Sequence, residues 1–468
     1  MSDELPNGWA TAPLSELLTT LESGSRPRGG VRGIADGVPS IGGEHLNYTG
    51  GFNFDSVKYV PKDFAAAMSK GRIQRHDILV VKDGATTGKT AFVDSRFPYD
   101  EAFVNEHVFI CRPRKEIEPQ FLFRFLTSMD GQKRILENFK GSAQGGINQT
   151  FAPNTEVPLA PLTEQRRIVA KLETLLGKVD ASQQRLAKIP VLLKRFRHSV
   201  LAAACSGRLT ADWREERTTD CTDDTDKKPS VKSAKSVVKN WVSEDLPELP
   251  ETWSWVALGD YSRCFRGRFT PRPRNDPRYF GGKHPFIQIG NLPREGGFVT
   301  SHTQTLNDEG LAVSRKFPKG TVVIAIVGAT IGNTGVLAYD MCVTDSIVGL
   351  ETGDELGNRY VELFLRHKKD DIRQTSYSSG GQPNINLAAL NPYPLALPPL
   401  PEQQEIVRRV EGLFALADQL EERLAKARGQ VAKLTPSLLA RAFAGKLVPQ
   451  DPNDEPAADL LKRLKQSA

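Results

Sequence analysis

The feature that most constrains the fold is a long segment that occurs twice in the chain. PLTEQRRIVAKLETLLGKVD begins at Pro161, and PLPEQQEIVRRVEGLFALAD begins 238 residues later, at Pro399. Nine of these 20 positions are identical, and the register holds without a gap to SVLAAACSGRL (from Ser199) and SLLARAFAGKL (from Ser437). A repeat at a fixed offset indicates that one structural unit is used twice.

Each copy carries apolar residues at alternating spacings of four and three, which is the seam of a coiled coil. The first stripe consists of Ile168, Leu172, Leu175, Val179, Ser182, Leu186, Ile189, Leu193, Phe196 and Val200. The second consists of Ile406, Val410, Leu413, Ala417, Leu420, Leu424, Ala427, Val431, Leu434 and Leu438. Each predicted helix has about 44 residues and is roughly 66 Å long. Pro190 and Pro436 are expected to kink or split these helices.

A narrow apolar stripe cannot be buried by its own helix, so the two stripes most simply bury each other as an antiparallel pair. The alternative is two separate helices, each packed on its own domain. The predicted fold class is mixed α/β (α+β). It has two globular domains separated by a long antiparallel two-helix coiled coil, with a pseudo-two-fold internal repeat.

The segments that precede the two helices also correspond, although more loosely. Both contain short apolar strands, and GATTGKT (from Gly84) recurs as GATIGNT (from Gly328). A polar stretch without periodicity, 217–240, is typical of a flexible linker. The predicted organisation is a globular domain (1–157), a helical region (158–210), a linker (211–246), a globular domain (247–396), a helical region (397–448) and a tail (449–468).

GATTGKT suggests a nucleotide-binding P-loop, but its spacing excludes one. A P-loop has four residues between its first glycine and Gly-Lys, and here there are three. The segment that follows is strand-like and interrupted by Pro98, whereas a P-loop opens a helix. The second copy has Asn333 in place of Lys89. We therefore predict a tight turn in each domain, with Lys89 a possible phosphate contact as the alternative.

Composition excludes several classes of protein. No apolar run approaches the roughly 18–20 residues that span a bilayer. The five cysteines form no CxxC pair and the seven histidines show no HxxxH or HExxH spacing, so neither a disulfide framework nor a metal site is indicated. The polar N-terminus and scattered cysteines favour a cytoplasmic protein. The net charge of +6 permits nucleic-acid binding without requiring it.

The repeated helix starts and the helix ends LLKRFRHSVLAAACSGRL and LLARAFAGKL resemble the two conserved regions of the DNA-specificity (S) subunit of a type I restriction-modification system. The resemblance covers essentially the whole chain, and P-L-x-E-Q-x-x-I-V occurs twice in register. It implies that the globular domains are target-recognition domains that each read one half of a bipartite, asymmetric site in double-stranded DNA. It also implies that the coiled coil sets the spacer and docks two copies of an adenine-N6 DNA methyltransferase subunit.

The same resemblance implies that this chain is not an enzyme and binds no cofactor. S-adenosylmethionine, ATP and Mg would bind only to partner subunits, namely the methyltransferases and a motor/endonuclease subunit. From the residues alone, two different domains on a symmetric scaffold can read two words at a fixed spacing. The competing interpretation is a coiled-coil scaffold that binds proteins and has no DNA sequence specificity.

Arginines between Ser262 and Arg278 give the strongest local signal for DNA contact, because arginine-rich loops bind phosphates and guanine. Phe265 and Phe269 are interleaved with them, and prolines indicate a loop. The alternatives are a solvated basic loop or one that docks an acidic partner. The candidates are Arg263, Arg266, Arg268, Arg272 and Arg274, with Arg26, Arg28 and Arg32 in the first domain.

Two polar, glycine-rich loops are further candidates, because Gln and Asn side chains can pair with adenine. The alternative is turn chemistry. The candidates are Gln144 and Asn148 in the first domain and Gln382 and Asn384 in the second.

The repeated Glu-Gln pairs at the helix starts are candidates for partner docking. They are Glu164, Gln165, Glu402 and Gln403. The simpler alternative is a favourable acid in the first turn of a helix. The tetrapeptide Asn391-Pro-Tyr-Pro394 has the wrong order for an adenine methyltransferase motif, so we expect no catalysis there.

Overall fold

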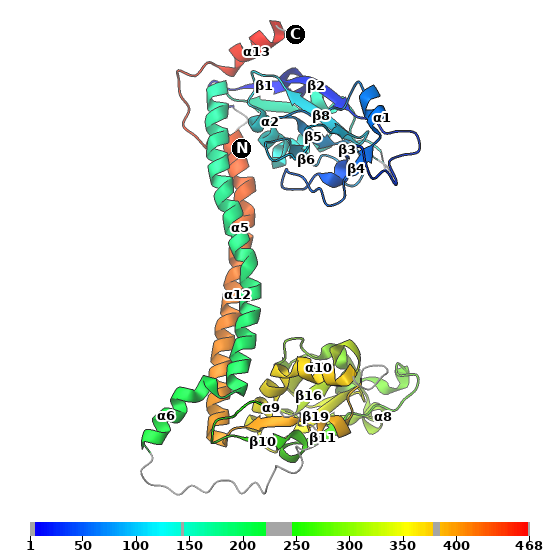
Figure 1. Ribbon diagram of the computed structural model, residues 1–468, viewed down its shortest axis with the longest axis vertical. Coiled ribbons are helices and arrows are strands. Elements are labelled where there is room, and N and C mark those ends of the chain that lie inside the picture. Colours follow the sequence, from blue (N-terminus) through cyan, green and yellow to red (C-terminus); the bar gives the residue numbers. More distant parts are fainter. Residues whose placement is uncertain (1–4, 142–144, 221–245, 378–383, 467–468) are drawn as a thin grey trace. The chain divides into compact units, whose positions relative to one another are not determined.

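The computed structural model describes residues 5–141, 145–220, 246–377 and 384–466 (Figure 1). Its internal contacts divide the chain into two compact units. Unit 1 contains Met1–Ala187 and Ala425–Ala468, and unit 2 contains Lys188–Leu424. Each unit combines one globular domain with a segment from each of two long helices.

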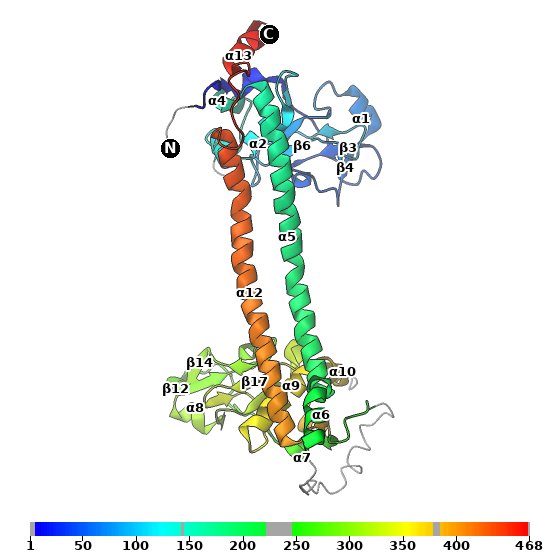
Figure 2. The ribbon, with the colours of Figure 1, turned by 90° about the vertical axis from the view of Figure 1, so that its left-hand side faces the viewer.

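The long helices are α5 (Leu162–Cys205) and α12 (Leu400–Phe443), and each has the expected 44 residues. In unit 1, Leu172 near the start of α5 belongs to the same core as Leu439 near the end of α12. In unit 2 the order is reversed, with Leu201 near the end of α5 packed with Ile406 near the start of α12. The helices are therefore antiparallel in each unit, and Figure 2 shows them side by side. This confirms the predicted coiled coil.

Both helices continue through their prolines, so of the two expected effects, a kink or a split, the split does not occur at Pro190 or Pro436. Pro190 has no N–H to donate to the carbonyl oxygen of Leu186, four residues earlier. The guanidinium of Arg428 on α12 donates to that oxygen instead, at 3.0 Å. The neighbouring helix thus satisfies the group that the proline leaves unpaired.

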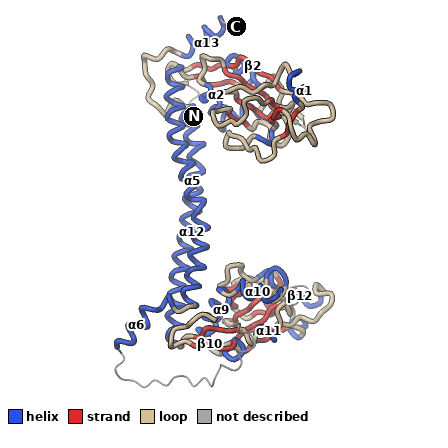
Figure 3. Tube along the Cα trace, in the orientation of Figure 1, coloured by secondary structure: helices blue, strands red, loops and turns tan. Residues whose placement is uncertain are grey.

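The first globular domain combines strands and short helices (Figure 3), and besides the β1–β9 pair it has two small sheets. One sheet has the order β2-β8-β5-β6, and the other has the order β4-β3-β7. The strands are β1 (Ala10–Pro13), β2 (Leu18–Ser23), β3 (Val38–Ile41), β4 (Lys58–Val60), β5 (Ile78–Val81), β6 (Thr90–Phe92), β7 (Phe103–Val104), β8 (Val108–Pro113) and β9 (Glu156–Leu159). The helices are α1 (Lys62–Ala67), α2 (Pro119–Leu126), α3 (Met129–Leu136) and α4 (Phe151–Asn154).

The second globular domain has the same plan, and each of its two main sheets has one more strand. Their orders are β11-β19-β16-β17-β13 and β14-β12-β18-β15. Its strands are β10 (Ser254–Ala257), β11 (Arg263–Arg266), β12 (Phe280–Ile287), β13 (Phe298–Val299), β14 (Gln304–Leu306), β15 (Arg315–Phe317), β16 (Val322–Ala325), β17 (Thr334–Leu337), β18 (Met341–Val343), β19 (Ile347–Glu351) and β20 (Pro394–Leu397). Its helices are α7 (Leu258–Tyr261), α8 (Asp308–Ala312), α9 (Glu355–His367), α10 (Lys369–Tyr377) and α11 (Leu387–Leu390).

One aromatic side chain of the central helix anchors each domain to the coiled coil. Phe121 of α2 packs edge-on against Trp9, with ring centroids 6.2 Å apart, and Tyr360 of α9 packs edge-on against Trp253 at 6.4 Å. Phe121 also contacts Phe443 of α12 at 5.2 Å. These large buried rings belong to a cluster that includes residues of the globular domain and of the long helices in each unit, while the outer parts of each domain have smaller clusters of their own.

The ends of each domain meet in a short antiparallel pair of strands. β1 pairs with β9, and β10 pairs with β20. Each domain therefore closes on itself directly before its long helix begins. The equal construction of the two halves confirms the pseudo-two-fold repeat.

The predicted linker begins too early. Residues 211–220 form a helix, α6 (Ala211–Asp220), because its charged side chains find partners on α12. Arg214 pairs with buried Glu402, and Asp212 pairs with Arg409 at 2.7 Å. Residues 221–245 lie outside the described part of the chain.

The predicted tail contains a further helix, α13 (Ala457–Gln466), which belongs to the core of unit 1. Leu460 and Leu464 are buried in that core, and the Ala457 amide donates to the carbonyl oxygen of Gly8 at 2.8 Å. None of the helices in the described residues combines the length and the hydrophobicity that crossing a membrane requires.

Candidate nucleic-acid interface

In both domains the loops that carry the candidate residues leave the main sheet at the same end. In the first domain β2, β5 and β8 are paired antiparallel, which brings the end of β2, the end of β5 and the start of β8 together. The arginine loop after Ser23, the turn after Val81 and the loop before Val108 leave the sheet there. The pairing of β11, β19 and β16 gives the equivalent end in the second domain.

The repeated GAT-x-G-x-T segment is a tight turn between antiparallel strands, as predicted. It joins β5 to β6 in the first domain and β16 to β17 in the second. Gly84 and Gly88 both have φ of +84°, and Gly328 and Gly332 have φ of +69° and +80°. Only glycine adopts this left-handed backbone without strain, which explains why both copies keep both glycines.

Lys89 already has contacts within its domain. Its ammonium group donates to the carbonyl oxygens of Gly43 and Leu46, at 3.2 and 3.0 Å, and lies 4.7 Å from the centre of the Tyr48 ring. The Tyr48 side chain is 83% exposed. Lys89 therefore fixes the loop that displays Tyr48, and a phosphate contact by Lys89 stays a prediction.

The arginines of the second domain gather around one carboxylate. Arg274 pairs with Asp345 at 2.8 Å, Arg272 approaches the same oxygen at 3.6 Å, and Arg266 donates to the Asp345 carbonyl oxygen at 2.6 Å. Arg272 and Arg274 nevertheless stay 57% and 48% exposed. Asp345 orients the guanidinium groups while leaving part of each available to an external anion.

Arg315 joins this cluster from a distant part of the sequence, and sequence reasoning missed it. It donates to the Arg266 carbonyl oxygen at 2.7 Å and lies over the Phe265 ring. Arg268 donates to the carbonyl oxygens of Ala312 and Ser314, at 3.3 and 3.1 Å. No local sequence signal links residue 315 to residue 266, because strand pairing brings them together.

The expected arginine loop is partly a strand, since residues 263–266 form β11. The two interleaved phenylalanines also differ from each other. Phe265 is partly exposed, but Phe269 is only 3% exposed and packs with Phe286 in the core. An aromatic contact with a ligand is therefore possible at Phe265 and excluded at Phe269.

The first domain has a smaller version of the same arrangement. Arg26 pairs with Glu106 at 2.8 Å, and Glu106 occupies the loop before β8, as Asp345 does before β19. His107 bridges Glu106 and Asp83, at 3.2 and 2.7 Å. Arg28 and Arg32 are exposed on the loop that follows β2. The structure thus places the predicted arginines of both domains at equivalent sheet ends.

The polar loops reach the same sheet end. Gly146 forms a β-bridge with Asp83 beside the first turn, and Asn384 forms one with Val327 beside the second. Asn148 accepts from the amide of Thr150 at 3.0 Å, which is turn chemistry. Asn384 is exposed. Gln144 and Gln382 lie outside the described residues.

The Glu-Gln pairs at the helix starts are buried, so their side chains do not form an accessible docking surface in this structure. Glu164, Gln165, Glu402 and Gln403 are all at most 3% exposed. The Trp9 indole N–H donates to Glu164 at 3.0 Å, and that of Trp253 donates to Glu402 at 2.9 Å. Each glutamine donates to a backbone carbonyl oxygen at 2.9 Å, that of Ala160 or of Pro398. The repeated motif therefore fastens each helix to its own domain.

The two anchoring glutamates differ in their charged partners. Arg214 of α6 pairs with Glu402, and Thr210 also donates to that carboxylate at 2.7 Å. In the part of the chain that the structure describes, no arginine forms an ion pair with Glu164, whose Oε1 is buried without a hydrogen-bond partner, and burial raises the pKa of this carboxyl above its usual value. Protonated Glu164 is thus favoured more in the folded chain than in the unfolded chain.

Comparisons with known proteins agree with this architecture. The family model described as "Type I restriction modification DNA specificity domain" matches residues 6–191 and 250–427. The EcoDI specificity subunit of Escherichia coli is 30% identical over 361 residues, which cover 75% of this chain and 76% of the relative. The EcoKI specificity subunit of Escherichia coli strain K12 is 26% identical over 486 aligned residues, which cover 99% and 96%.

Two solved structures share the fold. The crystal structure of the HsdS subunit from Thermoanaerobacter tengcongensis has a TM-score of 0.62 at 20% identity, with 95% of this chain and 99% of that chain covered. A chain from a study of complex assembly and conformational transition of the type I R-M system has a TM-score of 0.66 at 20% identity, with the same coverage.

Two repeated domains, each fastened to an antiparallel helix pair and each with arginines at one sheet end, define a two-module recognition protein. The family match covers more than half of the chain. The chain belongs to the DNA-specificity (S) subunits of type I restriction-modification systems.

Proposed function

We propose that each globular domain binds one half of a bipartite, asymmetric site in double-stranded DNA through the sheet end that carries its arginines. The observation that carries this proposal is the matched placement of exposed arginines in two domains of different sequence. Arg26, Arg28 and Arg32 occupy the loop after β2, and Arg272 and Arg274 occupy the loop after β11. Guanidinium groups can bind phosphates and read guanine, and different loops can read different words.

The coiled coil sets the number of unread base pairs between the two words in this proposal. α5 and α12 each contribute residues to both units, so their length fixes how much helix joins the two domains. The helices also dock two adenine-N6 methyltransferase subunits. Support comes from large apolar side chains that stay at least 40% exposed on them, namely Val191, Leu192, Leu416, Leu420 and Leu434. Such side chains are typical of surfaces that a partner covers.

Catalysis belongs to the partner subunits in this proposal. S-adenosylmethionine binds to the methyltransferases, and ATP and Mg bind to a motor/endonuclease subunit. The tetrapeptide that begins at Asn391 supports this division, because Tyr393 is only 6% exposed and the Leu258 amide donates to its carbonyl oxygen. The Tyr393 ring is packed in the core and cannot stack on a base. This assignment fits a cytoplasmic complex.

The test is DNA binding by the chain assembled with its methyltransferase subunits. The bipartite site is first obtained by mapping methylated adenines in the host with and without this gene. Binding to that site should be stronger than to a duplex with either half scrambled, and it should weaken steeply with salt because phosphate contacts release counterions. Equal binding to all duplexes and a flat salt response would favour the protein-binding scaffold instead.

A further inference from the structure

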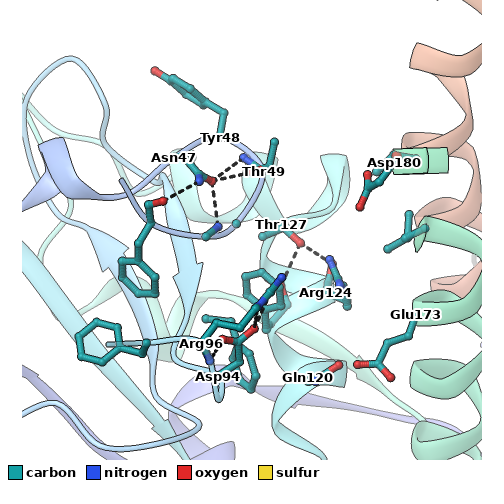
Figure 4. A pocket seen from close by; sticks show the side chains of 18 of the residues that line it. Asn47, Tyr48, Thr49, Asp94, Arg96, Gln120, Arg124, Thr127, Glu173 and Asp180 are labelled. Carbon is teal, nitrogen blue, oxygen red and sulfur yellow. Dashed lines mark hydrogen bonds and ion pairs between the residues drawn. The ribbon is translucent and has the colours of Figure 1, made fainter. Parts of the chain in front are cut away.

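Unit 1 contains a cavity of about 690 Å³ between its globular domain and the long helices (Figure 4). One wall is α2 with Gln120 and Arg124, followed by Thr127 directly after the helix, and the opposite wall is α5 with Glu173 and Asp180. Thr435 of α12 and the aromatic loop around Phe52 complete it. Its volume lies within the roughly 300–1,000 Å³ that is usual for binding sites.

The internal repeat shows what the equivalent part of unit 2 contains. Glu411 and Asp418 of α12 correspond to Glu173 and Asp180 of α5 at the offset of 238 residues. In unit 2 both carboxylates are paired with arginines. Arg359 of α9 contacts Glu411 at 2.5 Å, and Arg197 of α5 contacts Asp418 at 2.5 Å.

Each of these arginines is replaced by an uncharged residue in unit 1. Thr435 occupies the position of Arg197 at the same offset. Phe121 and Tyr360 occupy equivalent places against Trp9 and Trp253 and so align α2 with α9. That alignment puts Gln120 at the position of Arg359.

A third substitution follows from the same alignment, since Thr127 stands in place of Arg366. In unit 2 the Arg366 guanidinium pairs with Glu362 at 2.8 Å and lies 5.5 Å from the centre of the Phe414 ring. Leu176 lines the cavity at the position of Phe414. Three arginines of unit 2 thus have uncharged counterparts around the cavity, namely Gln120, Thr127 and Thr435.

The carboxylates that Arg359 and Arg197 bind in unit 2 have counterparts in unit 1, Glu173 and Asp180, whereas Phe123 stands in place of Glu362, the partner of Arg366. In the part of unit 1 that the structure describes, neither Glu173 nor Asp180 forms an ion pair. The Gln120 side-chain oxygen is buried without a hydrogen-bond partner and faces Glu173 (Figure 4). Arg124 is a cation on the same wall, whereas Arg96 is paired with Asp94 at 2.5 Å. The charged lining residues are Asp94, Glu173, Asp180, Arg96 and Arg124, which leaves one negative charge in excess.

Aromatic rings provide the second half of the site. In unit 2 the Arg359 guanidinium lies 4.3 Å from the centre of the Phe298 ring, in the loop Gly296-Gly297-Phe298. The matching loop of unit 1, Gly50-Gly51-Phe52, lines the cavity. A ring face beside carboxylates suits a guanidinium group, which can stack on the ring while its N–H groups donate to the carboxylates.

We propose that this cavity binds the guanidinium group of an arginine side chain that a second polypeptide supplies. Glu173 and Asp180 pair with the incoming group, and the rings around Phe52 cover its faces. An arginine is the expected occupant, because arginines of the chain itself, Arg359 and Arg197, fill the equivalent place in unit 2. The choice of a polypeptide over a free small molecule rests on the proposed function, in which partner subunits dock on these helices.

The first test uses N-acetyl-L-arginine amide, labelled with ¹³C at the guanidinium carbon, and the full-length chain. Adding the chain should broaden the ¹³C NMR signal of the probe. The dependence of this broadening on concentration should give a Kd of about 1–10 mM, the range for a single side chain. Glu173→Gln together with Asp180→Asn should weaken binding about tenfold, and Glu411→Gln, the matched change in unit 2, should leave it unchanged. N-acetyl-L-lysine amide should bind more weakly. No broadening at about 50 mM probe, or equal binding by the double variant, overturns the proposal.

The second test restores the arginines within the chain. Gln120→Arg with Thr435→Arg should abolish probe binding and raise the thermal unfolding midpoint, because the new side chains occupy the cavity as Arg359 and Arg197 do in unit 2. Unchanged probe binding by this variant, with the fold intact, would contradict the assignment of the site.

The third test identifies the source of the guanidinium group. The chain assembled with its methyltransferase subunits should no longer bind the probe, because a partner arginine fills the cavity. Full probe binding by the assembled complex would assign the site to a free small molecule and reject the polypeptide. Size-exclusion chromatography shows separately whether assembly occurs, so a failure of the proposed function is distinguishable from a failure of this inference.

Discussion

Arg428 donates a 3.0 Å hydrogen bond to the carbonyl oxygen of Leu186, the oxygen that Pro190 leaves without a backbone donor. A proline inside a helix costs about 3 kcal/mol, in part because this bond is missing. The contact lies within unit 1 and joins α12 to α5. It explains how α5 remains one helix across residue 190.

We expect Arg428→Ala to destabilise this part of α5 by about 1 kcal/mol, the net value of one hydrogen bond. The cost should be smaller in a Pro190→Ala background, because residue 190 then supplies its own N–H. Hydrogen exchange of peptides covering 182–196 measures the local free energy in both backgrounds. Equal costs would show that the arginine does not compensate for the proline.

The anchoring glutamates should respond differently to removal of their charge. Glu164 has a raised pKa in the folded chain, so the folded state binds more protons in the interval between the unfolded and folded values. The free energy of unfolding therefore falls as pH rises through that interval, and the loss is complete above it. Glu164→Gln removes the carboxyl group that has to ionise at high pH, so it should slow hydrogen exchange in the peptides of unit 1 around β1 at about pH 7.5. Near pH 4 the variant should give no extra protection.

Glu402→Gln is the matched change in unit 2, and it should act in the opposite direction. Arg214 loses its carboxylate, while the Trp253 and Thr210 bonds can persist. We expect a loss of about 1.5–3 kcal/mol at neutral pH, the range for hydrogen bonds to charged groups. The same sign for both variants would show that the two anchors are electrostatically equivalent.

Replacing Arg266, Arg268 and Arg272 with Ala should weaken binding to one half-site of the assembled complex by at least tenfold, because each phosphate or base contact is worth about 1–3 kcal/mol. Arg26, Arg28 and Arg32 changed to Ala should weaken the other half-site. Gel-shift titrations with one half scrambled at a time separate the two effects. Unaltered affinity in both variants would reject the arginine loops as the DNA-binding surface.

The spacer prediction concerns the coiled coil. Seven residues inserted between Gln183 and Lys188, with seven inserted opposite them in α12 beside Arg428, lengthen the helix pair by about 10 Å at 1.5 Å per residue. That is about three base pairs at 3.4 Å each, so the accepted spacer should lengthen by about three while both words stay the same. Methylome sequencing reports words and spacer together. New words with an unchanged spacer would disprove the role of the helices.

Sequence reasoning succeeded where a pattern repeats over many residues. The apolar stripes predicted both 44-residue helices and their antiparallel pairing, because every turn repeats the signal. It failed at α6, since the stability of that helix comes from Arg214 and Asp212, whose partners on α12 are about 190 residues away along the chain.

In the candidate site, too, local patterns were predicted from the sequence and contacts between distant residues were not. The arginines are visible as a local cluster, but the acids that orient them, Glu106 and Asp345, are reached only through strand pairing. Burial of Phe269 and of the Glu-Gln pairs is likewise a property of packing. An exposed acid in the first turn of a helix and a buried anchor have the same local sequence, so the alternatives for Glu164 and Glu402 could not be separated before the fold was known.

The bond from Ala457 to Gly8 has a consequence for the order in which the two units can fold. It holds the last helix of the polypeptide against its first strand, while β1 closes on β9 and β10 closes on β20. Unit 1 therefore contains two separate parts of the sequence, whereas unit 2 is one continuous segment. During synthesis on the ribosome, unit 2 can complete its core as soon as its own segment has emerged, but unit 1 must wait for Leu460 and Leu464 of α13.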